Sequence, residues 1–139
     1  MTVDNGQLTV MVSLRDNRIR GDFMDNTVLN KSKQFAVRII RLNQYLQSQK
    51  QEYTLSRQLL RSGTSIGANV AEAEHAQSRA DFCSKLNIAL KEAAETDYWL
   101  RLLHEADYLR DVEFQSVFAD CKEIEKLLAA IVKSTKGSI

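Results

Sequence analysis

The sequence contains no proline and only five glycines among its 139 residues. These residues form most tight turns, so their scarcity argues against β-hairpins, sandwiches and long ordered loops. No stretch is apolar for long enough to cross a bilayer, and residues 1–10 lack the basic start and apolar run of a signal peptide. We therefore expect a helical, cytoplasmic protein that contacts no membrane.

Cysteine and histidine are equally scarce, with two of each. Cys83 and Cys121 lie within apolar helical patterns, which favours reduced, buried thiols over a disulfide framework. A di-iron site in a helical bundle needs two Glu-x-x-His pairs, and only Glu72 and His75 have this spacing. A hydrolytic triad has no Gly-x-Ser-x-Gly turn on which to form. The sequence thus predicts no metal site, no cofactor and no enzymatic activity.

Four segments carry apolar residues at alternating steps of three and four, the spacing of an amphipathic helix. They cover residues 31–48, 53–75, 82–103 and 112–133. Candidate caps at their ends are Asn30, Ser78 paired with Asp81, Asp111, and Gly137 just beyond the last segment. Each stripe is apolar on one side only, and the short turns make neighbouring helices antiparallel. We therefore predict an all-α fold, an antiparallel up-down-up-down left-handed four-helix bundle, over residues 30–136.

The predicted core consists of one apolar stripe from each segment. Its members are Phe35, Ile39, Leu42 and Leu46; Leu55, Leu59, Ser62, Ile66, Val70 and Ala73; Phe82, Leu86, Ala89, Ala93, Thr96, Leu100 and Leu103; and Phe114, Val117, Cys121, Ile124, Leu128 and Ile131. Residues 1–29 lack such a stripe, because Val10, Val12 and Leu14 alternate only weakly. We expect an N-terminal arm that is flexible or weakly ordered, or a small strand.

Small residues interrupt the second segment. Gly63, Gly67 and Ala71 recur every four residues and leave a groove along one side of the helix. Glycine costs a helix about 1 kcal/mol relative to alanine, so two of them indicate a compensating close contact. The groove admits another helix of the same bundle, a neighbouring subunit or a ligand. We favour packing within the bundle.

The net charge is +1, but the charges are unevenly distributed. Residues 31–71 contain seven bases and one acid, whereas residues 72–139 contain thirteen acids and nine bases. The bases include two pairs spaced by three and four residues, which lie on one helical face: Arg38 with Arg41, and Arg57 with Arg61. These four arginines are the candidate contacts to RNA, DNA or another polyanion. The alternatives are a solvated face, or ion pairs with acids of a neighbouring subunit such as Glu92, Glu95 and Asp97.

A group of aromatic and apolar residues widens the apolar surface near the end of the third segment. The group contains Tyr98, Trp99, Leu102 and Tyr108. Tryptophan and tyrosine are enriched where subunits meet, so we predict an oligomer interface there. The alternative is a bundle end that aromatic rings seal.

Between residues 30 and 136 several strings of residues carry a family resemblance. They are Lys31-Ser32, Phe35 to Ile40, Leu55 to Asn69, Ala71 to Ala73, Ala89 to Ala93 and Glu95 to Leu100. In these strings the chain resembles a bacterial four-helix-bundle family named for proteins encoded in intervening sequences of 23S ribosomal RNA. The resemblance implies a homopentamer with no known enzymatic activity and an association with RNA-related elements. We accordingly expect a homo-oligomeric scaffold that binds RNA, DNA or another polyanion, the alternative being a protein adaptor that binds no nucleic acid.

Overall fold

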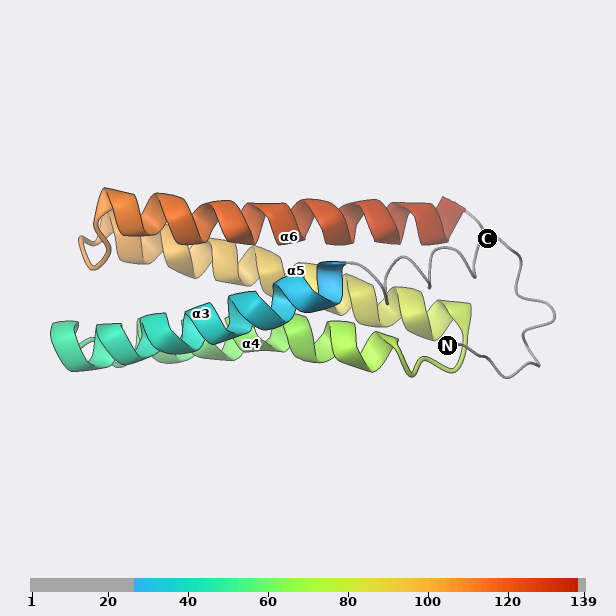
Figure 1. Ribbon diagram of the computed structural model, residues 1–139, viewed down its shortest axis with the longest axis horizontal. Coiled ribbons are helices and arrows are strands. Elements are labelled where there is room, and N and C mark those ends of the chain that lie inside the picture. The colour runs from blue at the N-terminus through green and yellow to red at the C-terminus, as the bar shows by residue number, and fades with distance from the viewer. Residues whose placement is uncertain (1–26, 138–139) are drawn as a thin grey trace.

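The computed structural model describes residues 27–137, which form four helices: α3 (Thr27–Lys50), α4 (Leu55–Ala73), α5 (Arg79–Glu105) and α6 (Asp111–Gly137). Each helix runs back along the one before it (Figure 1). Three short turns make these reversals, and α6 returns to lie beside α3. The predicted all-α four-helix bundle is confirmed. The left-handed twist of the bundle stays a prediction.

The first helix begins one turn earlier than predicted. Asn30 does not cap it, because α3 starts at Thr27 and Asn30 lies inside it. The reason is Val28, which is 1% exposed and extends the apolar stripe toward the N-terminus. Its carbonyl accepts a hydrogen bond of 2.8 Å from the Ser32 hydroxyl. The expectation of an N-terminal arm therefore fails for residues 27–29, and for residues 1–26 it lies outside the described part of the chain.

The caps of the other helices follow the expected chemistry at shifted positions. Ser78 caps α5 as predicted, since its Oγ accepts the Asp81 N–H at 3.0 Å. Asp111 is the first residue of α6 and does not cap it; Glu113 instead accepts the backbone N–H of Arg110 at 3.0 Å. This contact is half of a capping box. Gly137 is the last residue of α6 and does not lie beyond it.

The core lies where the four stripes meet. Every predicted core residue of α5 is buried, from Phe82 to Leu103. Leu42 and Leu55 are only partly buried, as is Ile131, whose expected place Val132 takes. The step from Leu128 to Val132 is four residues, because a straight helix of 3.6 residues per turn drifts away from a strict seven-residue repeat. None of the helices that the structure describes meets the length and apolarity needed to cross a membrane.

The glycines of α4 allow a close approach to α3. A Cβ atom placed on Gly63 would lie 2.8 Å from Cγ2 of Ile39, and one on Gly67 would lie 3.3 Å from the carbonyl oxygen of Ser32. The favoured interpretation, packing within the bundle, is confirmed for these two positions. Ala71 is exposed and takes no part in this contact, so the small-residue groove is shorter than predicted.

A buried carboxylate organises the turn between α3 and α4. Glu52 is 9% exposed, and its oxygens accept the backbone N–H groups of Thr54, Leu55 and Ser56 at 3.2, 3.0 and 2.7 Å. The Ser56 hydroxyl donates back to the Glu52 carbonyl oxygen at 2.8 Å. N–H groups at the start of a helix lack partners within the helix, and negative charge is favourable there. Glu52 therefore caps α4, although the sequence predicted only a short turn here.

Candidate nucleic-acid interface

Apart from Lys50 at the end of α3, the basic residues of α3 and α4 fall into two groups according to their partners in the fold. Three lie on the flanks of the two helices and form ion pairs with the acidic second half of the chain. The nitrogen-to-oxygen distances are 3.1 Å for Lys31 to Glu123, 2.7 Å for Arg38 to Asp120 and 2.6 Å for Arg61 to Glu95. Part of the predicted charge asymmetry is thus neutralised inside one molecule.

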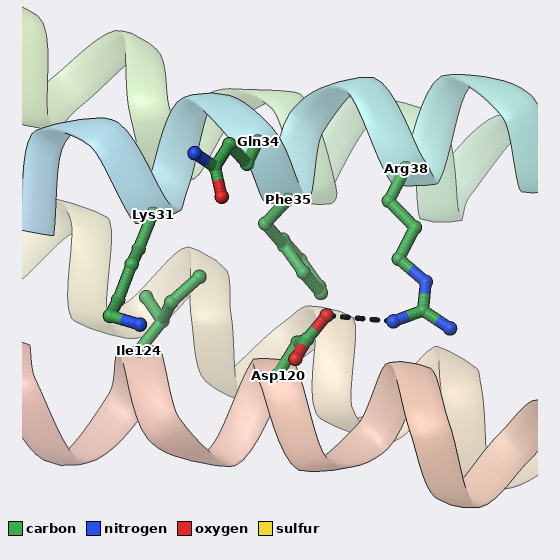
Figure 2. A pocket seen from close by; sticks show the side chains of 6 residues that line it. All are labelled: Lys31, Gln34, Phe35, Arg38, Asp120 and Ile124. Atoms are coloured by element: carbon green, nitrogen blue, oxygen red, sulfur yellow. Dashed lines mark hydrogen bonds and ion pairs between the residues drawn. The ribbon is translucent and has the colours of Figure 1, made fainter.

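Arg38 lies at the seam between α3 and α6. A cleft of about 270 Å³ opens there, with the buried side chains of Phe35 and Ile124 in its lining. Figure 2 shows Lys31 and Arg38 reaching from α3 toward α6 at either end of this cleft. Arg38 bonds to Asp120, and its second terminal nitrogen donates to the Ser116 hydroxyl at 2.6 Å. This guanidinium therefore connects two helices through partners in its own chain.

Arg61 occupies a comparable position between α4 and α5. Its guanidinium contacts carboxylate oxygens of Glu92 at 3.2 Å and Glu95 at 2.6 Å, both in the same chain. Glu95 also accepts the indole N–H of Trp99 at 2.9 Å. Arg61 thus connects α4, through Glu95, to the predicted aromatic interface. Two of the acids that the sequence offered as partners for a neighbouring subunit thus contact a base of their own chain, although Oε1 of Glu92 is buried without a hydrogen-bond partner.

The third of those acids, Asp97, is also satisfied inside the molecule. It is 6% exposed and contacts Arg101 at 2.7 Å and Lys122 at 3.2 Å. Burial raises the pKa of Asp97, but hydrogen bonds from Glu125 and Lys122, with the nearby positive charges, lower it overall. Each of Glu92, Glu95 and Asp97 thus contacts a base of its own chain, and pairing of these acids with a neighbouring subunit stays a prediction.

Lowering the pH should be visible in the fluorescence of Trp99, the only tryptophan. Hydrogen bonds from Arg61 and then from Trp99 hold the pKa of Glu95 below its ordinary value. A group with a depressed folded pKa stabilises the fold above its unfolded pKa, and this contribution is lost as the pH falls through the folded pKa. We expect an emission change whose midpoint lies below the ordinary carboxyl value. Arg61→Gln should raise that midpoint and Glu95→Gln should abolish the change, whereas an unchanged midpoint in Arg61→Gln would contradict the assignment.

A second group of bases lies on the outward side of α3 and α4. Lys33, Arg41 and Arg57 are exposed, and none has an acidic partner among residues 27–137. The Arg57 guanidinium donates only to the backbone carbonyl of Tyr53, at 3.0 and 3.3 Å. We call the outward surface that carries these three bases the α3–α4 face. Of the four predicted arginines, the structure places Arg41 and Arg57 here and turns Arg38 and Arg61 toward acids of α6 and α5.

No acid opposes the α3–α4 face from its own helices. Residues 27–73 contain two acids, Glu52 and Glu72. Glu52 is buried against the start of α4, and Glu72 pairs with Lys85 of α5 at 2.9 Å. Lys33 was not among the candidate nucleic-acid contacts predicted from the sequence. Its spacing from Val37 and Arg41 indicates the outward side of the helix and could have identified it.

The predicted oligomer interface lies elsewhere on the molecule. Tyr98 is 54% exposed and packs edge-on against Trp99, with ring centroids 5.2 Å apart. Trp99 and Tyr108 are partly buried against the core, and Leu102 is also partly buried. An exposed tyrosine beside a partly buried tryptophan and leucine is typical of an association surface. Its role in self-association stays a prediction.

The described residues offer few side chains suited to catalysis. Within residues 27–137 no three His, Cys, Asp or Glu side chains gather as a metal site would require. Both cysteines are free and buried, and burial raises the pKa of the Cys121 thiol, so this thiol stays neutral. His104 contacts Asp111 at 2.7 Å and stacks on Phe114, with centroids 4.1 Å apart, which ties the end of α5 to the start of α6.

The fold and this surface define a four-helix-bundle protein with a small basic face whose charges have no acidic partner among residues 27–137. The sequence profile of the 23S rRNA-intervening sequence protein family matches residues 24–130, and the chain belongs to this family. A solved structure from Bacteroides thetaiotaomicron, described as a protein with unknown function from the S23 ribosomal protein family, is 55% identical. The match covers 77% of this chain and 99% of that chain, with a TM-score of 0.76. No functionally curated protein matches the chain.

Proposed function

We propose that this protein is a non-enzymatic, cytoplasmic, homo-oligomeric scaffold that binds RNA through the α3–α4 face. Arg41, Arg57 and Lys33 bind the phosphates, while Arg38 and Arg61 border the face and hold it in place through their own ion pairs. The observation that carries the proposal is the set of exposed bases with no acidic partner in the described part of the chain. Such bases gain most from phosphates, because no ion pair within the protein has to be broken first.

Self-association strengthens this binding. The surface around Tyr98, Trp99, Leu102 and Tyr108 joins the subunits, in the pentamer that the family resemblance implies. Each subunit has few free cations, so one copy binds RNA weakly. A ring presents the α3–α4 face several times to one strand, and linked weak contacts raise the overall affinity. The mass of the protein in solution, measured by light scattering, tests this part, and a monomer would refute it.

Exchanging the outward bases for neutral residues should weaken RNA binding. In a gel-shift titration with structured RNA, affinity should fall steeply with salt, by a log-log slope of about 0.9 per phosphate contact on duplex and about 0.7 on single strands. The double variant Arg41→Gln/Arg57→Gln should bind more weakly and lower the slope by about 1.4 to 1.8, since two contacts are lost. Both side chains are exposed, so the fold should persist.

The matched control is Lys126→Gln/Lys133→Gln, which removes the same charge from exposed positions on α6. This variant should bind like the parent protein. A parent protein that retains no RNA at low salt would refute the proposal. The protein-adaptor function would then be preferred, because the α3–α4 face also suits an acidic protein partner.

A further inference from the structure

The α3–α4 face carries apolar side chains as well as charges. Val37 and Ile40 are 42% and 41% exposed on α3, and Tyr53, in the turn before α4, is 49% exposed. A surface that only neutralises phosphates gains nothing from such groups. Resting on the proposed function, we infer that the RNA bound here is single-stranded and that its bases stack on Tyr53 and lie against Ile40 and Val37, between the cations.

The helix register gives the order of these groups along the bundle. Three contacts show which residues of α3 and α4 lie level with each other: Gln47 with Ser56, Ile39 with Gly63, and Ser32 with Gly67. Arg57 is next to Ser56 and Arg41 is two residues from Ile39, so the two arginines are about 7 Å apart along the bundle at 1.5 Å per residue. Tyr53 lies one turn beyond Arg57. Along the bundle, Val37 and Ile40 therefore lie between Lys33 and Arg41, and Arg57 and Tyr53 follow beyond Arg41.

Helical spacing shows which side chains of α3 point away from the bundle. Lys33, Val37 and Ile40 follow one another at steps of four and three, which keeps them on one side of α3. All three are exposed, as is the neighbouring Arg41. The close contact at Gly63 and Gly67 brings α4 against this helix, and Arg57 is exposed on α4.

The contact between Arg57 and Tyr53 joins the two kinds of group. The guanidinium donates through two nitrogens to the Tyr53 carbonyl oxygen, at 3.0 and 3.3 Å, which keeps the cation near the aromatic residue. Single-strand binding proteins combine a basic surface with aromatic rings on which bases stack. Duplex RNA keeps its base faces inside the helix and presents phosphates and 2′-hydroxyls, so it cannot use an exposed tyrosine in this way.

Fluorescence anisotropy with a labelled uridine 20-mer and a labelled RNA duplex of equal length, both at low salt, tests the inference. The single strand should bind more tightly than the duplex. Tyr53→Ala should weaken single-strand binding about tenfold, because stacking on one base is lost. The duplex affinity should stay unchanged. Tyr53→Phe keeps the ring and should retain both affinities. Circular dichroism should show the same helicity for both variants, since Tyr53 lies outside the core.

The outcomes separate the inference from the proposed function. If the duplex binds as tightly as the single strand, or if Tyr53→Ala leaves single-strand binding unchanged, the inference is overturned while RNA binding stands. If neither RNA binds the parent protein, both fail. Binding of poly-glutamate in place of either RNA would likewise overturn the inference and indicate an acidic protein partner.

Discussion

Replacing Gly63 by valine is expected to lower the free energy of unfolding by about 2 to 3 kcal/mol, as overpacking a core contact does. An added Cβ would lie 2.8 Å from Cγ2 and 2.9 Å from Cγ1 of Ile39. These atoms are next to the branch of a fully buried, β-branched side chain and cannot rotate away. The helices α3 and α4 would have to move apart. Urea denaturation followed by circular dichroism measures the change.

Two further variants show whether this contact is the cause. Ala71→Val introduces the same side chain at an exposed position of α4 and should cost no more than about 0.7 kcal/mol, the difference in helix propensity. Ile39→Ala should itself cost about 2 to 5 kcal/mol. Ile39→Ala removes the Cγ atoms that obstruct the valine. The double variant Ile39→Ala/Gly63→Val should therefore lose clearly less unfolding free energy than the two single variants lose together. Strictly additive losses would refute the contact.

The second large effect concerns the cap of α4, where Glu52→Ala should lower the free energy of unfolding by about 2 kcal/mol. This change leaves the N–H groups of Thr54, Leu55 and Ser56 without their acceptor at a partly buried helix start. Losing a cap costs about 0.5 to 2 kcal/mol, and hydrogen bonds to a charged group fall at the upper end of the usual range. Thermal and urea unfolding measure the loss.

Glu52→Gln is the matched control, because its amide oxygen still accepts hydrogen bonds although the charge is gone. It should cost distinctly less than Glu52→Ala. If the two variants are equally stable, Glu52 does not act as a cap. In that case the Glu52 carboxylate would be available to neutralise bases of α3 and α4. An RNA interface made of unpaired basic residues would then have weaker support.

Helix positions and core residues were predictable because helical periodicity is local. The repeat from Phe82 to Leu103 placed α5 and its buried side correctly, and Ser78 caps it as expected. The start of α3 was missed because the sequence before residue 30 offers only Val28 to extend the stripe. The cap of α4 was missed because glutamate is an uncommon cap and acts here from the turn itself.

The candidate site was predicted only in outline. Four arginines on two helices were recognisable from their spacing, but their partners were not. Arg38 pairs with Asp120, which is 82 residues away in the chain, and Arg61 contacts Glu92, 31 residues away. Arg41 and Arg57 carry the same charge at similar spacing and have no such acid. Nothing local distinguishes the two kinds of arginine.

The sequence by itself determined four one-sided helices, their order and their antiparallel packing, because each depends on residues within a few turns of one another. Only the tertiary structure decided which charges are neutralised and which stay free. Ion pairing between helices depends on how far each helix is rotated and shifted against its neighbours, and the whole core sets that register. Gly63 against Ile39 fixes it for α3 and α4, and the outward direction of Arg41 and Arg57 follows from this contact.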